Sequence, residues 1–369
     1  MATIALDATY TVDPQPSGVA VYCRRLIESL AEIESEHHYL LCYRLSRFKR
    51  RRQFLRPDAP PGAAKPYFSV RYYQNPWTFW LPWQAELFHS LVQRPPAFRF
   101  RKEIVTVIDL FPLTGQNYST AEFQRKFSAL LLKAIQRAER VITPSQYTTE
   151  QLLKYTHVTR EKVRLIPFGV DLPVTSLNEQ ARLRQRESLV GKDHEMILMV
   201  GVVQTRKNTL NALKALRRLQ ARYRLVIAGG KGHGHEEVFE YIRKEGLNSR
   251  VVLLGYVPDE RLPSLYDAAN VFLFPSFEEG FGLPVLEAMA HGLPVVAAQT
   301  SSLPEVGGDA ALYVNPHDPA DIAEKVIQAT EDDSLRAVMI ARGLDRARQF
   351  SWRRTAEANL RVYEEVLAI

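Results

Sequence analysis

The sequence predicts an α/β protein that consists of two doubly wound domains, each built on a parallel sheet. The length of 369 residues fits about two domains. Short Val/Ile/Leu runs alternate with helical segments, a pattern typical of parallel strands that are covered on both faces. The composition, with 46% hydrophobic and 24% charged residues, is typical of a globular protein and argues against disorder.

The first half contains short apolar runs separated by helical and loop segments. The run 4–7 is followed by a loop that contains Gly18 and by an amphipathic segment that reaches about Ile33. The later apolar runs predict strands, and the segments between them have the spacing of amphipathic helices. The expected strands cover 4–7, 39–43, 87–89, 104–108, 141–144 and 163–167, and the expected helices cover 122–138 and 147–155.

The second half repeats the alternation more regularly. A polar, charged stretch over 173–194 joins the two halves, so we expect domains over 1–172 and 190–351, followed by a helix near the C-terminus. The expected strands cover 196–202, 224–228, 251–255, 271–274 and 294–298. One expected helix follows the first of these strands and ends near Leu219, and the others cover 236–245, 259–269, 284–291 and 352–367.

Cysteine usage and the N-terminus indicate a cytoplasmic protein. Cys23 and Cys42 are the only cysteines, which excludes a disulfide framework and a cysteine-rich zinc site. The N-terminal residues lack the basic and apolar regions of a signal peptide. The longest apolar runs are far shorter than the ~18 residues of a membrane span.

Positive charge is concentrated in the first half of the chain. Residues 1–172 contain 24 Lys and Arg against 15 Asp and Glu, whereas the remainder has a small negative balance. Such a basic patch attracts nucleic acid, acidic lipid headgroups or phosphorylated substrates, although a solvated face explains it equally well. The basic stretch without acidic residues contains Arg44, Arg47, Lys49, Arg50, Arg51, Arg52 and Arg56.

A glycine-rich loop and a helix start follow the expected strand 271–274. Pro284 fits the first turn of that helix, where its missing N–H costs nothing. Backbone amides at a helix N-terminus bind anions, and a glycine lets a phosphate approach the backbone closely. Because ligands of doubly wound domains bind beyond the carboxyl ends of the strands, we expect a phosphate in a crevice between the domains, against Gly280, Phe281, Gly282 and Leu283.

Two carboxylates of the same segment are candidate sugar-binding groups. Glu279 precedes the helix, and Glu287 lies eight residues later, so we expect both to face the crevice. One carboxylate is expected to accept from sugar hydroxyls and the other from a ribose diol. Glu278 is expected to be a solvent-facing carboxylate.

Two basic residues follow the first strand of the second half. Lys207 is well placed as a point charge for a diphosphate, and Arg206 is either its helper or a structural ion-pair partner. In the first half, Gly18 opens a helix and leaves room for a phosphate or a sugar, without the GxGxxG pattern of dinucleotide-binding proteins. The run Gly229–Gly234 lacks the ending of a P-loop, and we expect a flexible loop there.

These residues resemble those of the retaining nucleotide-sugar glycosyltransferases of the GT-B fold, glycosyltransferase family 4. The resemblance covers nearly the whole chain. Its most specific element is Glu-Gly-Phe-Gly-Leu-Pro-Val-Leu-Glu-Ala-Met-Ala, which contains Glu279 and Glu287. The other matching elements are Gly201 with Arg206-Lys207-Asn208, Pro167-Phe-Gly-Val-Asp171, Thr300-Ser-Ser-Leu-Pro-Glu-Val306 and Phe350-Ser-Trp352.

The resemblance implies roles for the candidate residues. Lys207, helped by Arg206, would hold the donor diphosphate, Glu279 would bind the donor sugar, and Glu287 would bind the ribose. Gly18 would belong to a loop that closes over the donor, and the helix 352–369 would cross back to the first domain. No metal is expected, because basic side chains and the helix dipole would neutralise the leaving diphosphate. The anomeric configuration would be retained.

One position departs from the family pattern. Many relatives carry a His directly before the Asp of the motif around Asp109, and that His reaches the donor sugar. This chain has Ile108 there, and an isoleucine side chain cannot form a hydrogen bond. Either Asp109 or His89 takes over the contact, or the contact is lost. The departure puts catalytic power in question more than nucleotide binding.

The resemblance favours a hexose donor, with GDP-mannose ahead of UDP-sugars, and a glycan or lipid-linked glycan acceptor. The basic stretch, and the aromatic run Tyr72–Trp83, predict a peripheral contact with the inner face of a membrane, unless these aromatic side chains belong to the core. Two other functions stay open: a nucleotide-sugar-binding protein with little catalysis, which Ile108 would explain, and a nucleic-acid-binding protein. No motif that reads nucleic acid is present, so we expect no nucleic-acid partner.

Overall fold

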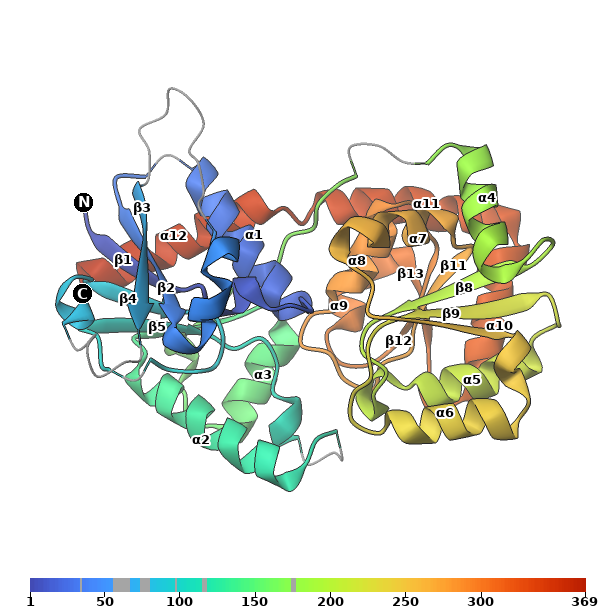
Figure 1. Ribbon diagram of the computed structural model, residues 1–369, viewed down its shortest axis with the longest axis horizontal. Coiled ribbons are helices and arrows are strands. Elements are labelled where there is room, and N and C mark those ends of the chain that lie inside the picture. The colour runs from blue at the N-terminus through green and yellow to red at the C-terminus, as the bar shows by residue number, and fades with distance from the viewer. Residues whose placement is uncertain (34, 56–66, 74–79, 97, 115–117, 174–176) are drawn as a thin grey trace. The chain divides into compact units, whose positions relative to one another are not determined.

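The computed structural model describes residues 1–33, 35–55, 67–73, 80–96, 98–114, 118–173 and 177–369. The chain divides into two compact units, each organised around one parallel sheet (Figure 1). Unit 1 consists of Met1–Thr114, Ala121–Gly169 and Phe350–Ile369, and unit 2 consists mainly of Val170–Gln349. Within the described residues, no helix combines the length and the apolar character that crossing a bilayer requires.

Unit 1 contains a seven-stranded parallel sheet with the order β3-β2-β1-β4-β5-β6-β7. The order reverses between β1 and β4, which is the doubly wound pattern that the sequence predicts. The strands are β1 (Thr3–Asp7), β2 (His38–Arg44), β3 (Tyr67–Tyr73), β4 (Leu87–Ser90), β5 (Lys102–Thr106), β6 (Arg140–Thr143) and β7 (Val163–Leu165). The helices are α1 (Gly18–Glu32), α2 (Ala121–Arg137), α3 (Gln146–Tyr155) and α12 (Trp352–Ala368).

Helices cover both faces of this sheet. Successive strand residues point to opposite sides, so neighbouring residues of one strand contact different helices. Val105 packs with Leu131 of α2 on one face. The next residue, Thr106, bonds the Tyr22 hydroxyl of α1 on the other face, at 2.9 Å. The C-terminal helix α12 packs beside α1. The last helix of the chain is therefore part of the first unit.

Unit 2 contains a six-stranded parallel sheet with the order β10-β9-β8-β11-β12-β13. The strands are β8 (Glu195–Val200), β9 (Tyr223–Ala228), β10 (Val251–Gly255), β11 (Val271–Phe274), β12 (Val295–Ala298) and β13 (Ala311–Val314). The helices are α4 (Glu179–Val190), α5 (Thr209–Arg218), α6 (His235–Lys244), α7 (Leu262–Ala268), α8 (Leu283–Ala290), α9 (Leu303–Gly307), α10 (Pro319–Glu331) and α11 (Asp333–Arg348). Helices α5, α6 and α10 cover one face, and α7 and α8 lie on the other (Figure 1).

Capping side chains fix where several helices begin. The Asn178 side chain accepts a hydrogen bond from the Ala181 amide at the start of α4, at 2.9 Å. Ser351 accepts from the Arg354 amide at the start of α12, at 3.2 Å. Each bond satisfies an amide that has no partner within its own helix, which is worth about 1 kcal/mol. Polar residues in the linking segments thus set the element boundaries.

The structure adds elements that the sequence analysis does not anticipate. The strands β3 and β13 each form one edge of a sheet. The stretch 173–194, which we expected only to join the halves, contains α4, and this helix packs against α7. The segments of α10 and α11 are likewise helical.

Candidate functional site

The central feature of unit 2 is the pair of adjacent strands β8 and β11. They pair in parallel, with Ile197 opposite Val271, and the strand order reverses between them. In doubly wound sheets, ligands bind beyond the carboxyl ends of strands at such a reversal. The loop after β8 carries Arg206 and Lys207, and the loop after β11 carries Glu279.

The structure brings these three side chains together in ion pairs. The Lys207 ammonium donates to Glu279 Oε1 at 2.7 Å. Arg206 Nη1 lies 2.9 Å from Glu279 Oε2. The Glu279 and Arg206 residues are only 7% and 8% exposed. We call Arg206, Lys207 and Glu279 the basic–acidic cluster, and it joins two loops that lie 72 residues apart in the sequence.

The charges of the cluster determine the ionisation of its carboxylate. Burial alone would raise the pKa of Glu279, but the positive charges of Arg206 and Lys207 outweigh it and lower the pKa to about 2. Glu279 is therefore an anion at neutral pH. The cluster has two cations and one anion, so its net charge is positive and suits a ligand with negative charge.

The loop after β8 follows a route that its residue types permit. A 3-10 turn, Thr205–Lys207, ends at Asn208, which has a left-handed φ of 58° that asparagine tolerates. The Asn208 side-chain amide donates to Pro275 O at 2.9 Å and to Pro316 O at 2.7 Å. Gly201 has a φ of 135°, and a Cβ there would lie 3.4 Å from Lys207 Cε. Asn208 thus anchors the loop that carries Lys207, and the missing side chain of Gly201 leaves room for the Lys207 side chain.

The glycine-rich loop after β11 leads directly into α8. Gly282 is its N-cap with a φ of 100°, and a Cβ at this position would lie 2.7 Å from Leu303 Cδ2. The Ser302 hydroxyl lies 2.9 Å from Glu279 O and 2.8 Å from Phe281 O, so it fastens the loop. The predicted phosphate-binding residues, Gly280, Phe281, Gly282 and Leu283, therefore surround a helix start in the same loop as Glu279.

Glu287 lies on α8 and pairs with a residue of α7. The Tyr266 hydroxyl donates to Glu287 Oε2 at 2.7 Å. Burial raises the pKa of Glu287, and the bond from Tyr266 partly opposes that rise. The expectation for Glu278 is wrong: this residue is 6% exposed and does not face solvent, and its backbone oxygen accepts from Arg206 Nη1.

The candidate residues of the first half lie in unit 1. Gly18 begins α1 and is exposed, and a Cβ added there would meet no atom within 4 Å. Asp109 follows β5 and is partly exposed. Its neighbour Ile108 is 8% exposed and donates its backbone N–H to Gln93 Oε1 at 3.3 Å. Unit 1 thus holds Gly18 and Asp109, and unit 2 holds the other predicted site residues.

His89 is not available to replace the histidine that the family pattern places at position 108. Its side chain is fully buried, with Nδ1 bonded to the Tyr363 hydroxyl at 2.8 Å and Nε2 bonded to Thr106 Oγ1 at 2.9 Å. Burial lowers its pKa to about 3, so His89 is neutral. It connects α12 to the sheet of unit 1. Of the two replacements expected from the sequence, only Asp109 remains.

The basic stretch is not uniform. Arg44 is 4% exposed and belongs to the core of unit 1, where its Nη2 lies 3.5 Å from Asp7 Oδ2 and its Nε donates to the Tyr73 hydroxyl at 3.1 Å. The residues that follow form the 3-10 segment Leu45–Gln53, which is mostly exposed. Arg56 lies outside the described residues. The expected anion-attracting patch therefore begins after Arg44.

The aromatic run divides between core and surface. Tyr73 is 1% exposed and packs in the core of unit 1. Trp80 and Trp83 are 38% and 79% exposed. Trp77 lies outside the described residues. The prediction that these aromatic side chains belong to the core is therefore confirmed for Tyr73 and wrong for Trp80 and Trp83.

Sequence reasoning missed three residues that support the site. Asn208 and Ser302 lie inside motifs that carry the family resemblance, but their roles as fasteners depend on contacts between distant loops. Tyr266 lies in an expected helix, and nothing in its local sequence distinguishes it from a core residue. Its role becomes visible only in the folded protein, where Tyr266 of α7 meets Glu287 of α8.

The two parallel-sheet units define a GT-B fold, and solved structures share this architecture. Sucrose-phosphate synthase from Thermosynechococcus elongatus superposes with a TM-score of 0.78 at 21% identity, over 100% of both chains. HepE from Anabaena, in complex with UDP and glucose, gives a TM-score of 0.76 at 16% identity, also over 100% of both chains. At these identities the likeness shows the fold alone.

Sequence comparisons then show the family. Residues 16–173 match the model of glycosyltransferase family 4, and residues 181–346 match the model of glycosyl transferases group 1. The O-antigen chain mannosyltransferase B of Escherichia coli is 30% identical over 292 residues, which cover 76% of each chain. The chain belongs to glycosyltransferase family 4 and is a transferase enzyme.

Proposed function

We propose that this enzyme transfers mannose from GDP-mannose to a glycan or lipid-linked glycan during polysaccharide synthesis. The observation that carries the proposal is the buried basic–acidic cluster, which offers cations for a diphosphate beside a carboxylate for a sugar. The relative at 30% identity is named as a mannosyltransferase of an O-antigen chain, which supports mannose and a polysaccharide acceptor.

In this proposal, the residues of unit 2 bind the donor. The Lys207 ammonium and the Arg206 guanidinium hold the diphosphate, helped by the amides at the start of α8. Glu279, an anion at neutral pH, accepts from hydroxyls of the sugar. Glu287, oriented by Tyr266, accepts from the ribose. The cations stabilise the negative charge that develops on the leaving diphosphate, and no metal ion is required.

The transfer itself would retain the anomeric configuration. The bond between the sugar C1 and the diphosphate oxygen breaks, and a bond from C1 to the acceptor oxygen forms on the same face. The acceptor proton moves to an oxygen of the leaving diphosphate. Asp109 of unit 1 is the proposed replacement for the missing histidine, and it would support the sugar or the acceptor during this step.

Binding of a nucleotide panel tests the donor. Thermal unfolding is measured with GDP, UDP, ADP, GDP-mannose and UDP-glucose, on the native protein, on Lys207→Ala and on the exposed control Lys244→Ala. A ligand at about 100 times its dissociation constant adds roughly 2.7 kcal/mol of stability. We expect a shift with the guanine nucleotides that Lys207→Ala loses and Lys244→Ala keeps. A shift with uracil nucleotides alone would assign a UDP-sugar donor, and no shift at all would refute the site.

We also propose that the segment Leu45–Gln53 contacts an anionic membrane surface. Lys49, Arg51 and Arg52 are exposed there, beside Leu45 and Phe48, which are 44% and 43% exposed. Cations next to exposed apolar side chains suit the interface of an acidic bilayer. The test is sedimentation with vesicles that contain phosphatidylglycerol. Replacing the three basic residues by Gln should abolish co-sedimentation, and unchanged co-sedimentation would refute the contact.

A further inference from the structure

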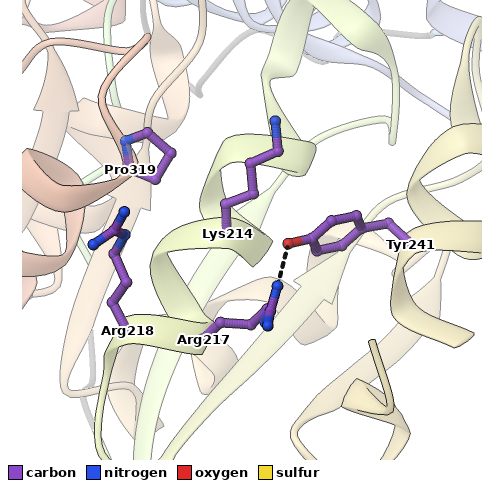
Figure 2. Close-up of a pocket in the computed structure, with 5 residues that line it drawn as sticks. All are labelled: Lys214, Arg217, Arg218, Tyr241 and Pro319. Atoms are coloured by element: carbon purple, nitrogen blue, oxygen red, sulfur yellow. Dashed lines mark hydrogen bonds between the residues drawn. The ribbon is translucent and has the colours of Figure 1, made fainter. Parts of the chain in front are cut away.

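A second candidate site lies on the outer face of α5, in unit 2. The side chains of α5, α6 and the start of α10 line a pocket of about 430 Å³ (Figure 2). This volume falls within the roughly 300–1,000 Å³ that small-molecule sites occupy. None of the lining residues belongs to the basic–acidic cluster or to the loop 280–283. The lining residues are Lys214, Arg217, Arg218, Tyr241 and Pro319.

The helical spacing places three cations on one side of α5. Lys214, Arg217 and Arg218 lie at i, i+3 and i+4, so their side chains share a face of the helix. Leu213 and Leu216 of the same helix are buried in the core of unit 2. The segment Thr209–Arg218 has no acidic residue that would neutralise these cations from within the helix.

The surrounding residues neutralise only one of the three. Arg217 pairs with Glu245 at 2.7 Å and donates to the Tyr241 hydroxyl at 3.4 Å, which holds it at one wall of the pocket (Figure 2). Within the described part of the chain, the side chains of Lys214 and Arg218 form neither an ion pair nor a hydrogen bond. The positive charges of Lys214 and Arg218 therefore have no partner in this pocket.

Helix electrostatics accounts for only part of this arrangement. Cations in the last turn of a helix interact favourably with its dipole, which explains the residue types of Arg217 and Arg218. It does not explain Lys214, one turn earlier, or the hollow that α6 and α10 form around these side chains. The ring of Tyr241 and the ring of Pro319 add apolar surface beside the cations, against which the carbon skeleton of a ligand can pack.

From these observations we infer that the α5 pocket binds a phosphate group carried by a small organic molecule, such as a phosphorylated sugar. Lys214 and Arg218 bind the phosphate, with Arg218 able to engage two of its oxygens. Arg217 adds positive charge from the wall, and Tyr241 and Pro319 contact the remainder of the ligand. The site is separate from the donor site and takes its ligand independently of it.

The test is isothermal titration with glucose 1-phosphate and with inorganic phosphate, on protein that carries Lys207→Ala. That substitution removes one of the proposed phosphate contacts of the donor site and so weakens binding there, and the comparison of the test variant with its control isolates the α5 pocket. The test variant adds Lys214→Gln and Arg218→Gln. The matched control adds Arg243→Gln and Lys244→Gln, which are exposed in the last turn of α6 and change the net charge equally.

We expect the test variant to lose at least tenfold in affinity and the control to stay within twofold, with tighter binding at low salt. A parallel arm uses phosphatidylglycerol vesicles. A loss restricted to vesicles would assign the same phosphate site to a lipid headgroup. Equal binding by both variants, or no binding of either probe or of the vesicles, would overturn the inference. In otherwise native protein, the pocket variant should keep its nucleotide affinity, so failure of this site is distinguishable from failure of the donor site.

Discussion

The Lys207 ammonium donates a 2.7 Å hydrogen bond to Glu279 and thereby joins the loops that follow β8 and β11. The same ammonium lies 4.6 Å from the centre of the Phe274 ring, at the end of β11. These contacts fix the position of the charge at the point where the strand order of unit 2 reverses. A diphosphate bound there would meet a cation that is already oriented, which reduces the entropy lost on binding.

The lowered pKa of Glu279 predicts an acid-sensitive contribution to stability. A carboxylate whose pKa falls from 4.5 to about 2 on folding stabilises the fold above pH 4.5, and this stabilisation is lost as the pH falls toward 2. At neutral pH, Glu279→Gln should therefore lower the free energy of unfolding by on the order of 3 kcal/mol. Denaturant titrations should show this difference shrinking between pH 4.5 and 2. A difference that is independent of pH would contradict the ion-pair account.

Tyr266 is expected to position Glu287 rather than to stabilise the fold. Tyr266→Phe removes the hydroxyl that donates to Glu287 but keeps the ring, which stacks on His291. Because that bond lowers the pKa of Glu287, its loss should raise the pKa and move the pH midpoint of GDP binding upward. We expect affinity to fall about tenfold near neutral pH, on the scale of a lost hydrogen bond to a charged group. The control Tyr313→Phe should change neither quantity, and an unmoved midpoint in Tyr266→Phe would refute the role.

The glycine at the start of α8 should resist substitution for two separable reasons. Gly282→Ala adds a Cβ at a φ of 100° and within 2.7 Å of Leu303 Cδ2. Gly246 also has a positive φ, 64°, but a Cβ there meets nothing within 4 Å. Gly246→Ala should therefore cost about 1–2 kcal/mol for the backbone alone, and Gly282→Ala more. Thermal unfolding gives the comparison, and equal losses would show that the contact with Leu303 is not tight.

Asp109 is expected to affect turnover and not donor affinity. Asp109→Asn should lower kcat at least tenfold while the Kd for GDP stays within twofold, because the proposed nucleotide contacts all come from unit 2. Steady-state kinetics and titration calorimetry measure the two quantities. A weakened Kd with unchanged kcat would assign Asp109 to nucleotide binding instead.

Metal removal should leave the enzyme active. In the proposed mechanism, Lys207, Arg206 and the start of α8 neutralise the negative charge of the leaving diphosphate. A chelator such as EDTA should therefore not change the rate of donor turnover. The rate is compared before chelation, after it, and after Mg²⁺ or Mn²⁺ is added back. A rate that falls with EDTA and returns with the metal would refute this part of the mechanism.

The order of strands and helices was predictable where apolar runs are bounded by polar residues. The expected strand 271–274 coincides with β11, and the expected helix 284–291 differs from α8 by one residue at each end. The strands β3 and β13 were missed, whereas β7 and β10, which also form sheet edges, were expected from their apolar runs. In β3, Ser69 and Arg71 interrupt the apolar residues, and the first three residues of β13 are only partly buried. Helix α4 was missed because its polar residues surround it on all sides.

The site could be predicted as a set of residues but not as a set of contacts. The residue types around Glu279 and Lys207 indicate sugar and phosphate chemistry, whereas their pairing depends on two loops that meet only in the folded sheet. The burial of Glu278 could not be predicted, since neighbouring residues of an irregular loop have no fixed alternation. For His89, the chemistry of the side chain suggested a function, and its buried bonds to Tyr363 and Thr106 show a structural role.

The most direct test is the turnover of GDP-mannose in the presence of an oligosaccharide acceptor that ends in mannose. Release of GDP and extension of the acceptor are measured together for the native enzyme, for Glu279→Gln and for Lys207→Ala. We expect one GDP to be released for each mannose transferred, and we expect the turnover rate of both variants to fall at least a hundredfold. Native enzyme that binds GDP-mannose but releases no GDP, or variants that retain native rates, would contradict a transferase reaction at this site.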